Sequence, residues 1–170
     1  DRSVSRGLGD VYKRQNYVDV IIPRGGKSLV EKVLNLSTVP TIGHLEGLCH
    51  IYLDKSFNFN LANKILINSK LRRTSICGAA ETLLVNNQIN KKDIFQLLIN
   101  LSEAGCKIIA DKNIKKIFPD SILAKSKDWK TEYLEAKISV KGVKNLDEAI
   151  NHIKIYGTNH TCLLYTSDAA

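Results

Sequence analysis

The chain has 170 residues, with 25 Lys and Arg against 17 Asp and Glu and a formal net charge of +8. This length allows one domain or parts of two, and the lysines are spread out, without the clustered basic face of a nucleic-acid binder. No apolar run approaches a membrane span, and four distant cysteines without a CxxC or zinc spacing indicate reduced thiols in a cytoplasmic protein and no metal site.

In chain order, strand-like apolar runs alternate with helical patterns. Residues 18–22 are expected to form a buried strand, followed by a turn at 23–26 and a helix capped by Ser28. Such alternation predicts an α/β fold with a mostly parallel sheet. Further strands are expected at 39–42, 48–53, 82–85, 107–110 and within 129–140, and helices at 60–70, 93–104 (closed by Gly105), 113–117 and 146–156 (ended by Gly157).

The two ends of the chain are expected to be non-native. Residues 10–15 (DVYKRQ) and 162–167 (CLLYTS) can be encoded by overlapping reverse-complementary DNA, as in the mosaic end of a transposase used to build sequencing libraries. We therefore expect 1–15 and 162–170 to be adapter-like tails, with natural disordered tails as the alternative. The remainder, 16–161, is expected to be a fragment of a longer protein, which fits the absence of methionine.

Cys77 is the most informative residue of the chain. Arg72 and Arg73 precede it, and the small residues Gly78 and Ala79 follow it. A thiol is nucleophilic as the thiolate, which guanidinium charge favours, and arginines can also grip a phosphate. The pattern indicates covalent chemistry on an anionic acyl compound. The alternatives are an inert small thiol and an arginine pair that interacts with a helix dipole.

Residues 72–85 (RRTSICGAAETLLV) resemble the gamma-glutamyl phosphate reductase family of the aldehyde dehydrogenase superfamily. Four further segments agree in order and spacing, and the resemblance runs from about residue 17 to 161. These segments are 18–27 (VDVIIPRGGK), 39–44 (VPTIGH), 47–54 (GLCHIYLD) and 131–134 (TEYL).

The resemblance implies an aldehyde dehydrogenase-like fold, with 16–46 as the end of the Rossmann-like nucleotide-binding domain and 47–161 as an incomplete catalytic domain. It also implies NADPH-dependent reduction of L-glutamyl 5-phosphate to L-glutamate 5-semialdehyde and phosphate, in proline biosynthesis. Cys77 would attack the acyl carbon and carry the thioester. The fragment alone is expected to be inactive. For the longer protein, the resemblance suggests a homo-oligomer and contact with glutamate 5-kinase.

The remaining site residues also follow from the resemblance. Arg24, Gly25, Gly26 and Lys27 would contact the cofactor where a strand passes into a helix, although two glycines alone also fit an ordinary turn. Glu132 would bind the nicotinamide ribose, with a surface strand residue as the alternative.

Two histidines and one glycine complete the expected site. Arg72, Arg73 and His50 are assigned to the substrate, and His44 and His50 are candidate proton donors, unless both histidines are satisfied within the fold. Gly43 stands where oxidising aldehyde dehydrogenases carry the Glu that activates water, so a thioester would be protected from hydrolysis.

Two other functions remain open at this point. A hydrolytic aldehyde dehydrogenase of another family is disfavoured by Gly43 and by the arginine pair. A non-enzymatic basic α/β binding module would need a clustered basic face and salt-sensitive binding to nucleic acid.

Overall fold

The computed structural model describes residues 17–43 and 45–160, and the backbone of 162–165. The chain divides into two compact units, Asp1–Glu46 and Gly47–Ala170. The assignment of these units to a nucleotide-binding and a catalytic domain stays a prediction.

The first unit contains the helix α2 (Lys27–Leu36), which buries Val30 and Val33. The two strands expected before and after this helix are reduced to a single parallel bridge between Ile21 and Thr41. The prediction of a buried strand at 18–22 was wrong, because a run paired at one residue has no sheet neighbours to cover it, and Ile22 is 73% exposed. The predicted Ser28 cap was also wrong, since Gly26 occupies the N-cap position.

The second unit is built on one parallel sheet of six strands in the order β4-β3-β5-β2-β1-β6. Its α/β class with a parallel sheet confirms the prediction. The strands are β1 (Cys49–Leu53), β2 (Ala80–Asn86), β3 (Lys107–Ala110), β4 (Ile122–Leu123), β5 (Lys137–Val143) and β6 (Cys162–Tyr165).

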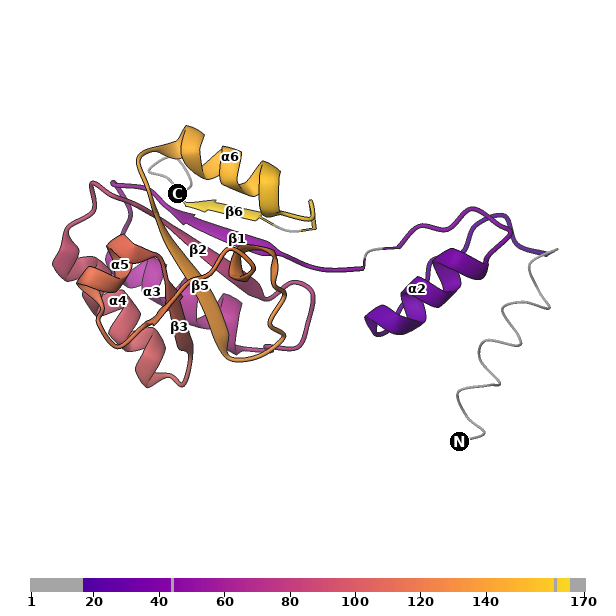
Figure 1. Ribbon diagram of the computed structural model, residues 1–170, viewed down its shortest axis with the longest axis horizontal. Coiled ribbons are helices and arrows are strands. Elements are labelled where there is room, and N and C mark those ends of the chain that lie inside the picture. Colours follow the sequence, from indigo (N-terminus) through magenta and orange to yellow (C-terminus); the bar gives the residue numbers. More distant parts are fainter. Residues whose placement is uncertain (1–16, 44, 161, 166–170) are drawn as a thin grey trace. The chain divides into compact units, whose positions relative to one another are not determined.

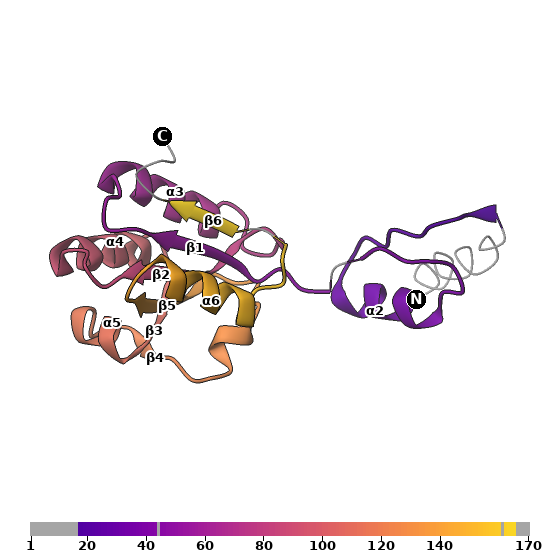
Figure 2. The same ribbon diagram turned by 90° about the horizontal axis from the view of Figure 1, so that it is seen from above.

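Strand β6 lies in the segment that the sequence analysis set aside as a non-native tail. Its backbone pairs in parallel with β1 from His50 to Leu53, and Figure 2 shows the two strands side by side. The structure therefore includes 162–165 in the sheet, and the non-native origin of this segment stays a prediction.

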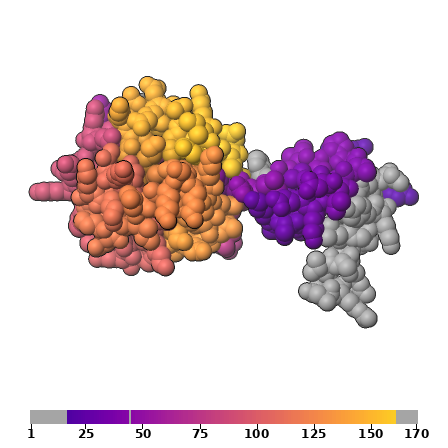
Figure 3. Space-filling view, viewed as in Figure 1, coloured from indigo at the N-terminus to yellow at the C-terminus, as the bar shows by residue number. Residues whose placement is uncertain are grey.

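Helices cover both faces of the sheet, which explains why every residue of the central strands β1 and β2 is buried. Figure 1 shows α3 (Phe59–Leu71), α4 (Lys91–Glu103) and α5 (Lys112–Ile117) on one face and α6 (Leu146–Tyr156) on the other. The larger core lies under α3, α4 and α5, and the smaller core, including Tyr52 and Ala149, lies under α6. In the space-filling view, the orange to yellow segments make up most of the visible face of the second unit (Figure 3).

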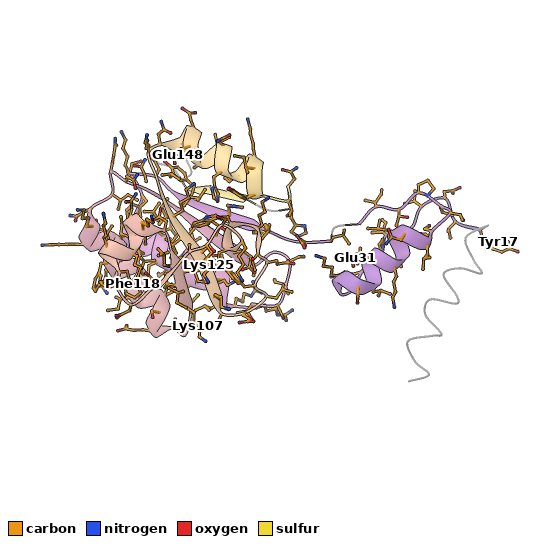
Figure 4. The ribbon with its side chains drawn as sticks, viewed as in Figure 1. Tyr17, Glu31, Lys107, Phe118, Lys125 and Glu148 are labelled. Carbon is orange, nitrogen blue, oxygen red and sulfur yellow. The ribbon has the colours of Figure 1, made fainter. Side chains whose placement is uncertain are left out.

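Side-chain caps fix where these helices begin. Asp111 Oδ1 accepts the N–H groups of Asn113 and Ile114 at the start of α5, while its Oδ2 accepts the Gly142 N–H from β5. Asn145 caps α6 by accepting the Glu148 N–H, and the side chain of Glu148, which Figure 4 labels, reaches back to the N–H of the residue before that cap. The bonds to Asp111 and Asn145 satisfy N–H groups in the first helical turns that would otherwise lack partners.

The sequence analysis did not predict β4 or the short 3-10 helix η2 (Asp128–Lys130). The strand expected within 129–140 begins at Lys137 instead. The residues between η2 and β5 form an irregular segment held by tertiary contacts, and this segment contains Glu132.

Candidate active site

The candidate site lies at the amino-terminal end of the parallel strands. Gly47 precedes β1, Cys77 precedes β2, Glu132 precedes β5 and Thr158 precedes β6. These four strands are parallel neighbours in the order β5-β2-β1-β6. The segments that precede neighbouring parallel strands meet at the same end of these strands. Residues far apart in the sequence therefore come together here.

Cys77 lies in an exposed turn whose backbone packs against the start of β1. The Cys49 thiol donates a hydrogen bond to the Cys77 carbonyl oxygen at 3.1 Å. Gly47 packs so closely that a Cβ built on it would lie 1.9 Å from that same oxygen. The turn therefore rests on the start of β1, while the Cys77 side chain is exposed and accessible to a reactant.

Glu132 belongs to the same group of contacts. Its Oε1 accepts the Gly47 N–H at 2.8 Å, so the carboxylate touches the residue against which Cys77 packs. Its Oε2 has no hydrogen-bond partner among the described residues, which leaves an acceptor for a ligand hydroxyl. A single free oxygen fits one hydroxyl of a ribose diol.

Thr158 is a site-supporting residue that the sequence analysis missed. Its Oγ1 accepts the Leu48 N–H at 3.0 Å, which holds the beginning of β1 next to Gly47. The sequence signal for this contact was weak, because a threonine that follows a helix and its terminal Gly157 is common in connecting segments.

Arg72 and Arg73 follow α3 and are both exposed. They line a pocket of about 340 Å³ together with Ile76 and Gly78, the neighbours of Cys77. Two guanidinium groups next to a thiol can hold an anionic group close to it. The arginines also stand at a helix C-terminus, so the dipole alternative remains compatible with their position.

Behind the turn, Lys70 and Glu81 form an ion pair of 2.8 Å between side chains that are 0% and 1% exposed. Burial raises the pKa of Glu81, and the Lys70 ammonium opposes this shift. The sequence analysis did not recognise the pair. The available signal was a glutamate inside the apolar run of β2, which needs a partner when buried.

His50 is placed apart from Cys77. It follows Cys49 in β1 and therefore faces the opposite side of the sheet, where its ring lies 5.5 Å from that of His152 in α6. Its Nδ1 bonds to the Leu48 carbonyl at 2.9 Å, and burial lowers its pKa. The buried ring packs against α6, and a substrate contact of His50 stays a prediction that this placement does not favour. His44 lies outside the described residues.

The predicted cofactor residues Arg24, Gly25, Gly26 and Lys27 lie in the first unit, at the exposed start of α2. The Lys27 ammonium pairs with the Glu46 carboxylate. Gly25 has a φ of +156°, which favours glycine. No acidic residue occupies the first turn of α2, so its N–H groups suit an anionic ligand.

Gly43 also lies in the first unit and has a packing role. A Cβ on this residue would lie 3.0 Å from Pro23 Cγ and 3.3 Å from Val30 Cγ1. The backbone at this position is therefore packed tightly against its neighbours, and a glutamate there would require them to move.

A larger hollow of about 840 Å³ lies between α4 and α5, and Lys91, Phe95 and Lys116 are among its lining residues. None of the predicted site residues lines it.

The described residues contain no group of three or more His, Cys, Asp or Glu placed to hold a metal ion. Within the same ranges, no helix has both the length and the apolar character needed to cross a membrane.

No family model matches the chain. The gamma-glutamyl phosphate reductase of Bartonella tribocorum is 50% identical over 162 residues, which are 95% of this chain and 39% of that protein. Over most of its length, the chain is similar to gamma-glutamyl phosphate reductases. This confirms the predicted resemblance, and the match is longer than the range 17–161 from which it was predicted. The chain spans about two fifths of the length of these curated relatives.

Solved structures agree with this similarity. The crystal structure of the gamma-glutamyl phosphate reductase from Thermotoga maritima has a TM-score of 0.86 and 38% identity, over 91% of this chain and 37% of that one. An engineered glycolyl-CoA reductase with bound NADP+ has a TM-score of 0.61 at 18% identity, covering 89% of this chain and 43% of its own. At that identity the likeness concerns the fold alone. An acetylating aldehyde dehydrogenase from Geobacillus thermoglucosidasius shares this fold, with a TM-score of 0.62 and 21% identity over 89% of this chain and 42% of that one, in agreement with the predicted aldehyde dehydrogenase-like fold.

Proposed function

We propose that the chain carries the nucleophile-bearing part of an NADPH-dependent gamma-glutamyl phosphate reductase, with Cys77 as the nucleophile. One observation carries the proposal. The exposed Cys77 lies on a backbone braced by Gly47, beside Glu132 and two arginines, in a chain that is about half identical to these reductases.

In the proposed reaction, the Cys77 thiolate attacks the acyl carbon of L-glutamyl 5-phosphate and phosphate leaves. The pocket of Arg72 and Arg73 holds the acyl phosphate or the α-carboxylate of the substrate. Negative charge develops on the acyl oxygen, and the Cys77 N–H is the donor proposed to stabilise it.

The chain's residues fit a nicotinamide cofactor at two places. In the second unit, Glu132 Oε2 is available for a ribose hydroxyl. In the first unit, the start of α2 at Gly26 offers backbone N–H groups, and the first turn of the helix contains no acidic residue of its own. The cofactor supplies the hydride that reduces the thioester to the aldehyde level. The product is L-glutamate 5-semialdehyde, which places the activity in proline biosynthesis.

The test requires the longer reading frame from which this chain is expected to derive. The reverse reaction, oxidation of glutamate semialdehyde by NADP+, should depend on phosphate and should be lost in Cys77→Ala. Cys106→Ala is the matched control, because that thiol is buried and burial raises its pKa to about 12. Oxidation that proceeds without phosphate would instead indicate a hydrolytic aldehyde dehydrogenase.

We also propose that the 170-residue chain alone does not turn over, since it spans about two fifths of its relatives. Steady NADPH oxidation with acyl phosphate by this chain would contradict that statement. Cytoplasmic location, homo-oligomerisation and contact with glutamate 5-kinase stay predictions for the longer protein.

A further inference from the structure

The pair of Lys70 and Glu81 is the only ion pair with both side chains buried among the described residues. Removing two charges from water is costly, and the attraction between them often does no more than offset this cost. A buried pair is therefore weak evidence for stability. The geometry that the pair imposes on its neighbours is more informative about its role.

The second oxygen of Glu81 indicates that role. While Oε2 binds Lys70, Oε1 accepts the Leu134 N–H at 3.3 Å. Leu134 has a φ of +54°, which is unusual for a residue with a side chain. This backbone conformation persists only when surrounding contacts impose it, and the Glu81 carboxylate is one of those contacts.

The neighbours of Leu134 are held at the same time. The Tyr133 hydroxyl hydrogen-bonds to Ser139 Oγ in β5 at 2.8 Å, and Glu132 accepts the Gly47 N–H. The segment has no helical or strand hydrogen bonds of its own. Its conformation therefore depends on tertiary contacts at each successive residue, to which the Tyr133 hydroxyl adds a hydrogen bond donated to Asp128 Oδ1 at 3.2 Å.

A continuous chain of contacts leads from the ion pair to the candidate nucleophile. Glu81 holds Leu134, two residues from Glu132. The Glu132 carboxylate holds Gly47, whose backbone packs against the carbonyl of Cys77. Lys70 lies in the last turn of α3, two residues before the arginine pair. The pair thus joins α3, β2 and the entry to β5 immediately behind the site.

We propose that Lys70 and Glu81 are positioning residues that fix the segment 132–134, so that Glu132 is held against Gly47 with one oxygen available for the cofactor. Lys70 selects the side-chain conformation of Glu81 in which Oε1 faces Leu134. This inference rests on the proposed function for the role of Glu132 and Cys77, but the positioning itself is measurable without substrate or cofactor.

The experiment compares two double variants of the 170-residue chain. Lys70→Met with Glu81→Gln removes both charges but keeps an oxygen that accepts the Leu134 N–H, whereas Lys70→Met with Glu81→Leu removes this acceptor as well. Amide hydrogen exchange is read at Leu134 and Gly47, with amides of β2 and β5 as internal references. Glu135→Gln, which breaks the exposed pair with Lys137, is the surface control.

The leucine variant should exchange about tenfold faster at Leu134 and at Gly47, with little change in the reference strands. The glutamine variant and the surface control should leave Gly47 protected. The rate of Cys77 alkylation by iodoacetamide should change in the leucine variant alone.

Release of Leu134 without any change at Gly47 would overturn the proposal. Equal loss of protection throughout the second unit would also overturn it, because the pair would then be merely structural. If the leucine variant does not fold, Glu81→Asp replaces it, since its shortened carboxylate keeps the charge and loses the reach. In the longer enzyme, the leucine variant or Glu81→Asp should raise the KM for the cofactor more than it lowers kcat, whereas the glutamine variant and the surface control should leave this KM unchanged.

Discussion

The backbone of Gly47 occupies the space beside the Cys77 carbonyl so fully that any Cβ at residue 47 would lie 1.9 Å from this oxygen. A Cβ atom does not approach a non-bonded oxygen to that distance, so alanine at residue 47 must displace backbone rather than a flexible side chain. The start of β1 and the turn that carries the thiol are thereby fitted to each other.

Gly47→Ala is therefore expected to destabilise the second unit by about 2 kcal/mol, within the range measured for overpacked interiors. Urea unfolding would measure the loss. Gly78→Ala is the matched control on the other side of Cys77, because a Cβ there meets no atom within 4 Å. Equal stability of the two variants would show that the turn moves away from β1 at little cost.

Glu132 is predicted to serve the cofactor and the fold through different oxygens. Glu132→Gln keeps an acceptor for Gly47, so folding should be preserved while the cofactor KM of the longer enzyme rises by about tenfold, as for a lost charged hydrogen bond. Glu132→Ala should also speed exchange of the Gly47 amide. Wild-type cofactor affinity in the glutamine variant would exclude a ribose contact.

The arginine pocket is predicted to bind inorganic phosphate. Phosphate at its dissociation constant should slow Cys77 alkylation by about half when ionic strength is held constant, if the occupied pocket blocks the thiol. Replacement of both Arg72 and Arg73 by alanine should abolish this protection. Lys64→Ala removes an exposed cation from the same helix outside the pocket and should retain it. Protection that persists without the arginines would place the anion elsewhere.

His152 should make folding sensitive to mild acid. Burial, Lys141 and His50 lower its pKa to about 3. The unfolded chain therefore binds this proton near pH 6.5, whereas the folded chain does not. The stabilisation is complete above pH 6.5 and is lost as pH falls toward 3, at about 1.4 kcal/mol per pH unit.

Urea midpoints at pH 7 and pH 5 would measure this dependence. The midpoint should fall between these values in the wild type and fall less in His152→Gln. An identical fall in both chains would assign the effect to other groups, such as His50, whose pKa burial also lowers.

Local patterns of apolar spacing and helix-ending glycines predicted most helices and strands of the second unit. The strand at 107–110 and the helix at 146–156 have the predicted bounds. Asn90 moved the start of α4 to Lys91, because its side chain caps the helix earlier than the apolar spacing suggested. The strand β4 carries no such signal, since it has two residues and both are exposed.

The candidate site was predictable as residue types and not as geometry. The thiol, the arginine pair and Glu132 could be singled out from motifs. The contacts that place them join residues 28 to 110 positions apart, such as Cys49 with Cys77 and Leu48 with Thr158. Neither periodicity nor spacing carries this information. His50 shows the same limit. Side chains alternate between the two faces of the sheet along β1, so His50 points away from the face on which Cys49 contacts the Cys77 turn.

The two ends of the parallel strands carry different kinds of residue, one bound within the fold and the other exposed. At the edge where strands end, Asp111 binds both the start of α5 and the backbone of β5, and Asn86 bonds to the Tyr52 hydroxyl and to Asp54. At the edge where strands begin, the thiol and the arginines remain exposed. Selection for heat resistance and selection for a new acyl substrate would therefore act on opposite ends of the same strands, and changes made at one end need not be undone at the other.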